Sequence, residues 1–186
     1  MRRDPPSRIE LDDGTYLRLL VIDDAECVAE AVAESIEHLR PWMQWATEES
    51  TDPSFQRARL RRLAEMQQRG EEWDFGLFAN GEGALLGTFG LMTRRGPGSL
   101  EIGYWLHGAH TDRGYATRAV AALTDVALGI GGVDRVLIYC DEANERSAAV
   151  PRRLGFALTS IASRAPEAPA ETGREMIWTR ERDARD

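Results

Sequence analysis

The sequence contains no lysine, so all 23 of its basic residues are arginine, against 31 aspartate and glutamate residues. The formal net charge is −8, whereas a protein that binds nucleic acid usually carries a basic surface. The one arginine-rich run, residues 57–62, has acidic residues nearby and is typical of a solvated helix face. We therefore expect no nucleic-acid partner, and the acidic balance favours a cationic substrate such as a protonated amine.

Cysteine and long apolar runs are scarce as well. Cys27 and Cys140 have neither metal-ligand nor redox spacing, so we expect two small core residues and no metal site. No apolar run approaches the ~20 residues of a membrane span, and residues 1–6 lack the apolar stretch of a secretory signal. These absences predict a cytoplasmic protein that has no membrane partner.

Apolar periodicity and turn residues predict seven strands and four helices. Asp52-Pro53 is a helix-start signal, Asn80-Gly81 is a hairpin signal, and the helix after Gly114 carries an apolar stripe that includes Val120 and Leu123. The predicted strands cover residues 15–21, 73–79, 84–93, 99–106, 135–140, 156–163 and 175–179. The predicted helices cover residues 24–39, 53–68, 115–128 and 144–154.

This order predicts an α/β fold: a mixed, mostly antiparallel seven-stranded sheet with helices on both faces. A right-handed β-α-β crossover would place strand 135–140 parallel to strand 99–106. We expect one domain over residues 1–186, ordered from about residue 8 to residue 180, with a charged tail (181–186) that frays. The loop at 165–170 is rich in proline and alanine and is expected to be mobile.

The segment from residue 106 to residue 117 links a strand to a helix. Unpaired N–H groups and a partial positive charge at a helix N-terminus bind anions. Gly114 and Ala116 are small enough to let a diphosphate approach, and Arg113 could add a charged contact. An ordinary helix start with a glycine turn has the same pattern, so this loop alone leaves both interpretations open.

The wider context resembles a known family. Residues 101–106 (EIGYWL) and 113–117 (RGYAT) resemble the acetyl-CoA-binding motif of GNAT N-acetyltransferases, and are most similar to the RimJ/RimL branch, which acetylates protein N-termini. Asn144 and Ser147 ahead of residues 154–156 (LGF) add to the resemblance, as does the segment 39–42 (LRPW) with Trp45.

The resemblance implies that strands 99–106 and 135–140 splay apart around the pantetheine arm of acetyl-CoA, and a bulge at Gly103 would help to open that gap. It implies the following cofactor-binding residues: Leu106, His107, Gly108, Thr111, Asp112, Arg113, Gly114, Tyr115, Ala116, Thr117 and Asn144. Two positions depart from the family pattern. Thr111 stands where glutamine or arginine is common, and Pro151 stands where many members have a tyrosine that protonates the departing thiolate.

Glu101 is the preferred candidate for the general base, because it shares a strand face with Gly103 and Trp105 and burial there would raise its pKa. A half-exposed surface carboxylate is the alternative, and His107 and His110 are other candidate bases. On the resemblance, Ser147 would assist the leaving thiol.

Asn144 and Ser147 also suit a helix cap. Trp42 and Trp45, with Trp105, would wall the acceptor pocket, although tryptophans between two helices are also ordinary core residues.

The resemblance therefore implies direct acetyl transfer, in a ternary complex, from acetyl-CoA to a primary amine, most simply the N-terminal α-amine of a protein. One alternative is a small acceptor such as a polyamine or an antibiotic, or a larger donor such as succinyl-CoA. A second is a non-catalytic acyl-CoA sensor, and a third is an acyl-enzyme on Cys140. Family members are often homodimers, so a homodimer is possible.

Overall fold

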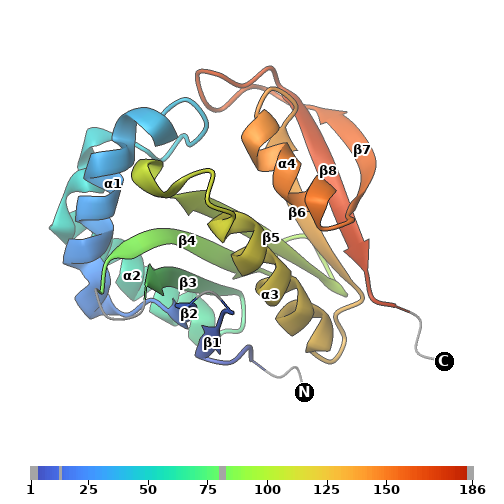
Figure 1. Cartoon of the computed structure of the whole chain (residues 1–186), viewed down its shortest axis with the longest axis horizontal. Helices are drawn as coiled ribbons and strands as arrows, with labels where there is room; N and C mark the ends of the chain where they lie inside the picture. Colours follow the sequence, from blue (N-terminus) through green and yellow to red (C-terminus); the bar gives the residue numbers. More distant parts are fainter. Residues whose placement is uncertain (1–3, 13, 80–82, 184–186) are drawn as a thin grey trace.

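A computed structural model describes residues 4–12, 14–79 and 83–183. All its strands lie in one sheet of order β1-β2-β3-β4-β5-β6-β8-β7, with α1 and α2 on one face and α3 and α4 on the other (Figure 1). The strands are β1 Arg8–Glu10, β2 Thr15–Leu19, β3 Glu72–Ala79, β4 Leu85–Met92, β5 Ser99–Leu106, β6 Arg135–Asp141, β7 Ala157–Ser163 and β8 Arg174–Glu181. The helices are α1 Ala25–Leu39, α2 Pro53–Gln68, α3 Tyr115–Gly129 and α4 Glu145–Arg153.

Every predicted strand and helix is present, and the fold class is confirmed. The predicted strand count of seven is wrong, because β1 adds an eighth strand that is only three residues long and too short to show a periodic pattern. The predicted Asn80-Gly81 turn lies outside the described residues. No helix in the described ranges is both long and apolar enough to cross a bilayer.

The parallel pair β5 and β6 is hydrogen-bonded over a short stretch only. Residues 99–101 of β5 pair with residues 135–137 of β6, and beyond this point β5 pairs only with β4 while β6 pairs only with β8. The predicted splay is therefore present. The predicted bulge at Gly103 is wrong, because the β4–β5 register is continuous there; the register shifts instead between β3 and β4, at Leu77 and Phe78, and between β7 and β8, at Leu158 and Ser160.

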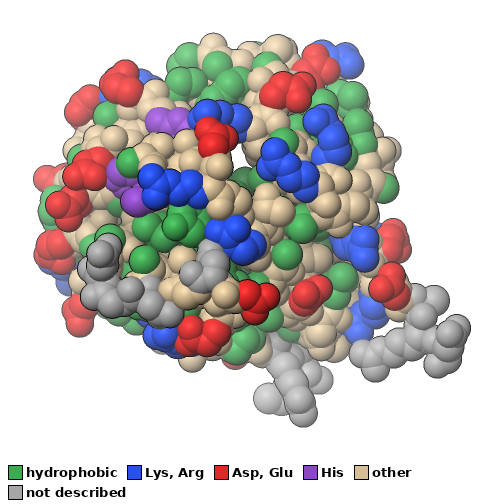
Figure 2. Space-filling model, in the orientation of Figure 1, with side chains coloured by type: hydrophobic (Ala, Val, Ile, Leu, Met, Phe, Trp, Pro, Cys, Tyr) green, Lys and Arg blue, Asp and Glu red, His purple; other side chains and the backbone are tan. Residues whose placement is uncertain are grey.

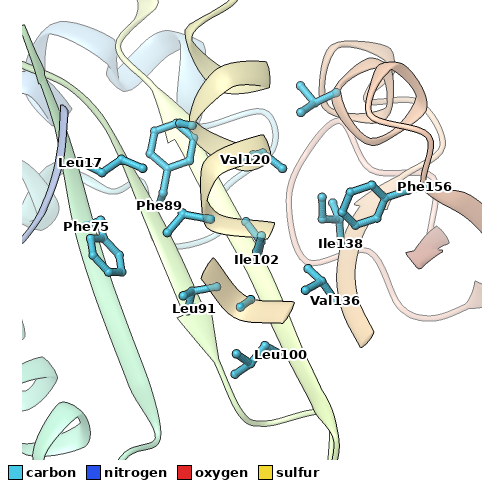
Figure 3. Close-up of a cluster of buried hydrophobic side chains, with 14 of the residues drawn as sticks. Leu17, Phe75, Phe89, Leu91, Leu100, Ile102, Val120, Val136, Ile138 and Phe156 are labelled. Atoms are coloured by element: carbon cyan, nitrogen blue, oxygen red, sulfur yellow. The ribbon is translucent and has the colours of Figure 1, made fainter. Parts of the chain in front are cut away.

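The side chains of β5 alternate between two hydrophobic cores. Leu100 and Ile102 pack with Val120 of α3 in the larger core (Figure 3). Trp105 packs on the opposite face, in a smaller core that includes Val32 of α1. The face of β5 that carries Glu101 and Gly103 therefore lies beneath α1 and α2.

The C-terminal segment is fixed further along the chain than predicted. β8 runs to Glu181, and the Arg182 guanidinium donates to the carbonyl oxygens of Val133 at 2.9 Å and Ile130 at 2.7 Å. The Arg182 N–H donates to the carbonyl of Asp134 at 2.7 Å. The predicted fraying is therefore wrong as far as residue 182, because Arg182 satisfies carbonyls at the end of α3 and in the turn that follows.

The loop between β7 and β8 is also tied down rather than free. The Glu171 carboxylate accepts from the Arg164 guanidinium at 2.6 Å and from the N–H of Glu167 at 2.7 Å. The Ala170 N–H donates to the Pro41 carbonyl at 2.9 Å, which joins this loop to the connection after α1 (Figure 1).

Asp141, at the end of β6, holds the base of the same loop. Its carboxylate accepts the N–H groups of Thr172 at 3.0 Å, Gly173 at 2.9 Å and Ala143 at 3.0 Å. Burial raises the pKa of Asp141, but these hydrogen bonds more than offset burial and leave the pKa below its ordinary value. A depressed folded-state pKa stabilises the fold above the unfolded pKa of about 4, and this contribution is lost as the pH falls through the folded pKa.

We predict that Asp141→Asn lowers the free energy of unfolding at pH 7 by about 1–3 kcal/mol, because an amide NH₂ replaces an acceptor among N–H donors. Urea unfolding across a pH series should show that the difference in unfolding free energy between this variant and the wild type shrinks as the pH falls below about 4. Exposed Asp125→Asn is the matched control and should show little change at any pH. A difference that is constant with pH would contradict this role for the carboxylate.

Candidate active site

Two cavities meet where β5 and β6 part. The larger, of about 770 Å³, lies on the α1–α2 side of the sheet. The smaller, of about 150 Å³, lies among the C-terminal end of α1 and the N-terminal ends of α3 and α4. The residues that line both cavities are Trp42, Met43, Tyr104, Trp105, Asn144 and Ser147. Two molecules bound in these cavities would therefore meet beside these side chains.

The smaller cavity contains the exposed start of α3. Gly114 precedes the helix with φ +77°, a conformation that side-chain-bearing residues rarely adopt. No side chain caps the helix, and within the described chain the N–H groups of residues 115–117 have no hydrogen-bond partner. Of the predicted cofactor-binding residues, the ones that line this cavity are Leu106, Thr111, Asp112, Gly114, Tyr115, Ala116, Thr117 and Asn144. The geometry is that of an anion site.

Arginines from α4 add positive charge to the same cavity. Arg146 and Arg153 line it, and the Arg146 guanidinium donates to the Asp112 carboxylate at 2.8 Å. Figure 2 shows blue side chains gathered around the hollow between α3 and α4. Sequence reasoning missed both arginines, because on a short charged helix they have the pattern of ordinary surface residues.

Three predicted cofactor-binding residues, His107, Gly108 and Arg113, do not line either cavity. The His107 N–H donates to the Leu86 carbonyl at 2.9 Å, and the Gly108 N–H donates to the Ser35 hydroxyl at 3.0 Å. These two donors therefore hold the loop against the sheet and α1 instead of facing a ligand.

Neither histidine of this loop is placed as a base. His107 Nε2 lies 2.7 Å from the Glu34 carboxylate, and its Nδ1 accepts the Ala109 N–H at 3.1 Å. The His110 ring packs beside His107, and burial lowers its pKa. Both rings lie outside the larger cavity, so the alternative bases considered from the sequence are not supported.

Ser147 lies at the junction of the cavities and is fixed from two sides. Asn144 Oδ1 accepts the Ser147 N–H at 3.1 Å, which confirms the helix-cap interpretation. The Tyr104 hydroxyl donates to the Ser147 carbonyl at 2.9 Å and lies 3.2 Å from the Ser147 Oγ. The sequence offered no signal for this contact, because Tyr104 occupies a core-facing position of β5. Cys140 is close by, and burial raises the pKa of its thiol to about 11.

The larger cavity is acidic. It is lined by four arginines (Arg59, Arg94, Arg95 and Arg164) and by eight carboxylates, namely Glu49, Glu72, Asp74, Glu101, Asp141, Glu167, Glu171 and Glu175. Each of the four arginines is paired with a carboxylate of the same cavity. The excess of unpaired carboxylates favours a cationic ligand. The described residues nevertheless include no group of His, Cys, Asp or Glu side chains spaced to hold a metal ion.

Glu101 lies on the floor of this cavity and is only 3 % exposed. The predicted burial is present, but two counter-ions come with it. Arg94 donates to both carboxylate oxygens, and Arg95 donates to Oε2 at 2.5 Å while its guanidinium lies 3.7 Å above the Tyr139 ring. Both oxygens of the Glu101 carboxylate are therefore already paired with arginines.

Glu72 is a second floor carboxylate that sequence reasoning missed. It lies opposite Met92, which lies opposite Glu101, so the three side chains share one face of the sheet. Burial and the neighbouring Asp74 charge raise the pKa of Glu72, and no ion pair to it occurs among the described residues. Glu72 is therefore a competing candidate for the base.

Aromatic side chains form the walls of the larger cavity, and part of its floor consists of glycine backbone. The rings of Trp45 and Trp105 lie 5.9 Å apart. Trp45 and Phe55 are each 40 % exposed and line the cavity, as Trp42 also does. Gly90 pairs with Gly103 across β4 and β5, so two neighbouring positions on the floor carry no side chain. The three predicted acceptor-site tryptophans thus do line one cavity.

The chain matches known acetyltransferases in sequence and in structure. Residues 15–157 match the family model for the acetyltransferase (GNAT) domain. The chain is 27 % identical over 146 residues to the [ribosomal protein uS5]-alanine N-acetyltransferase of Escherichia coli (strain K12), which covers 77 % of this chain and 75 % of that protein.

Two solved structures share the fold at low sequence identity. The ribosomal-protein-S5-alanine acetyltransferase from Vibrio fischeri superposes with a TM-score of 0.86, at 22 % identity, over 96 % of this chain and 98 % of that chain. RimL, a ribosomal L7/L12 α-N-protein acetyltransferase solved in complex with coenzyme A, superposes with a TM-score of 0.84, at 21 % identity, over 96 % and 99 %.

We predict that Gly114→Val abolishes coenzyme A binding in calorimetry, because a side chain at this left-handed position crowds the start of α3 and strains its turn. Arg146→Ala should weaken binding more than Arg113→Ala, since only Arg146 lines the cavity. Gly132→Val is the matched control: Gly132 has φ +81° and no atom near its Cβ position, so it carries similar backbone strain away from the site. Unchanged affinity in Gly114→Val would remove the basis for this anion site.

Proposed function

Because the chain belongs to the GNAT acetyltransferase family, we propose that it moves the acetyl group of acetyl-CoA to the N-terminal α-amine of a protein or peptide. One observation carries this proposal: an anion-binding cavity and an acidic cavity meet at Ser147. Acetyl-CoA is a polyanion and a protonated amine is a cation, so each substrate suits one cavity. The chain would act as one catalytic domain, with both substrates bound at once.

The donor site follows from the smaller cavity. The diphosphate would lie against the free N–H groups of residues 115–117, with Arg146 as a counter-ion. The pantetheine arm would run into the opening between β5 and β6 and bring the thioester to Ser147. The fit rests on the unpaired N–H groups and on the absence of a side chain at Gly114.

The chemistry is a direct transfer. The neutral amine attacks the thioester carbon, the C–S bond breaks, and its electron pair leaves with the coenzyme A sulfur. The amine proton passes to a carboxylate of the larger cavity, either directly or through water. The Ser147 hydroxyl donates a hydrogen bond to the sulfur as charge develops. An acyl-enzyme on Cys140 is disfavoured, because a thiol with a pKa of about 11 contains little thiolate at neutral pH.

The acceptor class is argued from protonation and charge. An α-amine with a pKa near 8 is roughly one-tenth neutral at pH 7, whereas about one lysine side chain in a few thousand is neutral. A single carboxylate base therefore serves an α-amine more easily. Relatives named for ribosomal protein S5 support a ribosomal-protein N-terminus, which would place the enzyme in the cytoplasm.

The alternative functions require different properties of the larger cavity. A polyamine or another small amine also suits its acidic lining and is the runner-up acceptor. A non-catalytic acyl-CoA sensor would not need Ser147 at the junction or carboxylates on the floor.

We predict that short peptides with a free N-terminus are acetylated faster than the same peptides with a blocked N-terminus and a lysine. Acetyl-CoA turnover at pH 7 with matched peptide pairs measures this, because only the position of the amine differs. Spermidine and an aminoglycoside complete the screen. If only those two compounds are acetylated, the acceptor is a small amine and not a protein N-terminus.

We predict that Glu101→Gln lowers kcat about 10²-fold at pH 7, as expected for the loss of a general base. The deficit should shrink as the pH rises and the amine deprotonates unaided. Glu72→Gln is the matched variant, since it removes the neighbouring floor carboxylate that has no arginine partner in the described chain. A large, pH-dependent loss in Glu72→Gln with little loss in Glu101→Gln would transfer the base role to Glu72.

A further inference from the structure

The carbonyl of Ser147 lacks its usual partner in α4. In an α-helix this oxygen would accept the N–H four residues ahead, but that residue is Pro151, which has no N–H. The Tyr104 hydroxyl donates to the carbonyl instead, at 2.9 Å. A side chain of β5 thus replaces a helical hydrogen bond and spans the opening between β5 and β6.

The same contact places the phenol beside the serine hydroxyl. Tyr104 Oη lies 3.2 Å from Ser147 Oγ, and either atom can donate. The Tyr104 ring is fixed by stacking on Phe89, with centroids 5.9 Å apart and planes 18° apart. Burial raises the pKa of Tyr104, so the phenol keeps its proton throughout the neutral range. Both partners line the two cavities at their junction.

We propose that Tyr104 is a positioning residue for the leaving group: its hydroxyl orients the Ser147 hydroxyl so that the serine hydrogen points at the coenzyme A sulfur. The inference rests on the proposed function, since it requires the thioester to lie at Ser147. Tyr104 acts through the serine and does not itself touch the sulfur.

Two arrangements of hydrogens fit the same heavy atoms. In the free protein, Ser147 can donate to Tyr104 while Tyr104 donates to the Ser147 carbonyl. When negative charge develops on sulfur, the serine hydrogen turns to the sulfur and the tyrosine hydrogen turns to Ser147 Oγ. Neither hydroxyl loses its proton in this step: the C–S electron pair stays on sulfur, and the bond to hydrogen that breaks is the amine N–H, whose proton goes to the carboxylate base.

The geometry also accounts for Pro151. The proline removes the N–H that would otherwise compete for the Ser147 carbonyl. Pro151 therefore leaves the Ser147 carbonyl available to the Tyr104 hydroxyl.

A double-mutant cycle tests the coupling. Tyr104→Phe and Ser147→Ala should each lower kcat about tenfold, as expected for losing one hydrogen bond in the transition state, and leave the KM for acetyl-CoA nearly unchanged. The double variant should be no slower than Ser147→Ala, because Tyr104 acts only through the serine. Tyr16→Phe, on the distant strand β2, is the matched control. If the kcat losses of the two single variants multiply in the double variant, the proposal is overturned.

A second readout does not depend on turnover. Ultraviolet titration of bound coenzyme A reports the pKa of its thiol, and Tyr104→Phe and Ser147→Ala should each raise that pKa by about 0.5 to 1 unit. The affinity for desulfo-coenzyme A, which has no thiol, should not change. An unaltered thiol pKa in Tyr104→Phe overturns the proposal. Failure of the wild type to acetylate any amine overturns the proposed function instead, and leaves this titration as the test of Tyr104.

A third variant separates positioning from stability. Tyr104→Phe also leaves the Ser147 carbonyl unpaired, and Pro151→Ala supplies an N–H that can pair with it. The combined Tyr104→Phe, Pro151→Ala variant should regain part of the lost unfolding free energy and none of the lost kcat. Recovery of kcat along with stability would mean that Tyr104 serves only the helix, which is the outcome that contradicts positioning.

Discussion

The short contact between β5 and β6 is the constraint on which the site depends. The two strands share three register positions and then follow different neighbours, β5 along β4 and β6 along β8. Beyond that point each strand has one edge without a ladder partner, and buried backbone groups at such an edge need other partners. Both cavities and the Tyr104–Ser147 contact lie at this opening. The opening therefore gives the molecule a place where two ligands can meet inside a sheet.

Much of the fold could be predicted because its elements are long and strongly periodic. The apolar stripe of α3 and the alternation of β5 each identify one buried face, and the structure buries Val120, Leu123 and Leu100 accordingly. The start of α3 was predictable for a local reason: a glycine, a helix N-terminus and a family motif coincide within a few residues. β1 has three residues and no period, so only the tertiary structure reveals it.

The parts of the site that could not be predicted are contacts between residues far apart in the chain. Arg59 has the pattern of a solvated helix face, yet it pairs with buried Asp74 and lines the larger cavity. The counter-ions of Glu101 come from the turn before β5, and the Glu171 contacts that order the β7–β8 loop have no periodic signature. Each of these depends on which side chains the folded sheet brings together, and such information is absent from local sequence patterns.

The position of the two cavities has a consequence for the length of the acceptor. The smaller cavity lies among the C-terminal end of α1 and the N-terminal ends of α3 and α4, whereas the larger cavity lies on the α1–α2 side of the sheet. On the proposed function, coenzyme and acceptor occupy two cavities that share lining residues only at the junction around Ser147. Only the first residues of a long acceptor chain need to reach this junction, so the rest of the chain can remain outside the larger cavity.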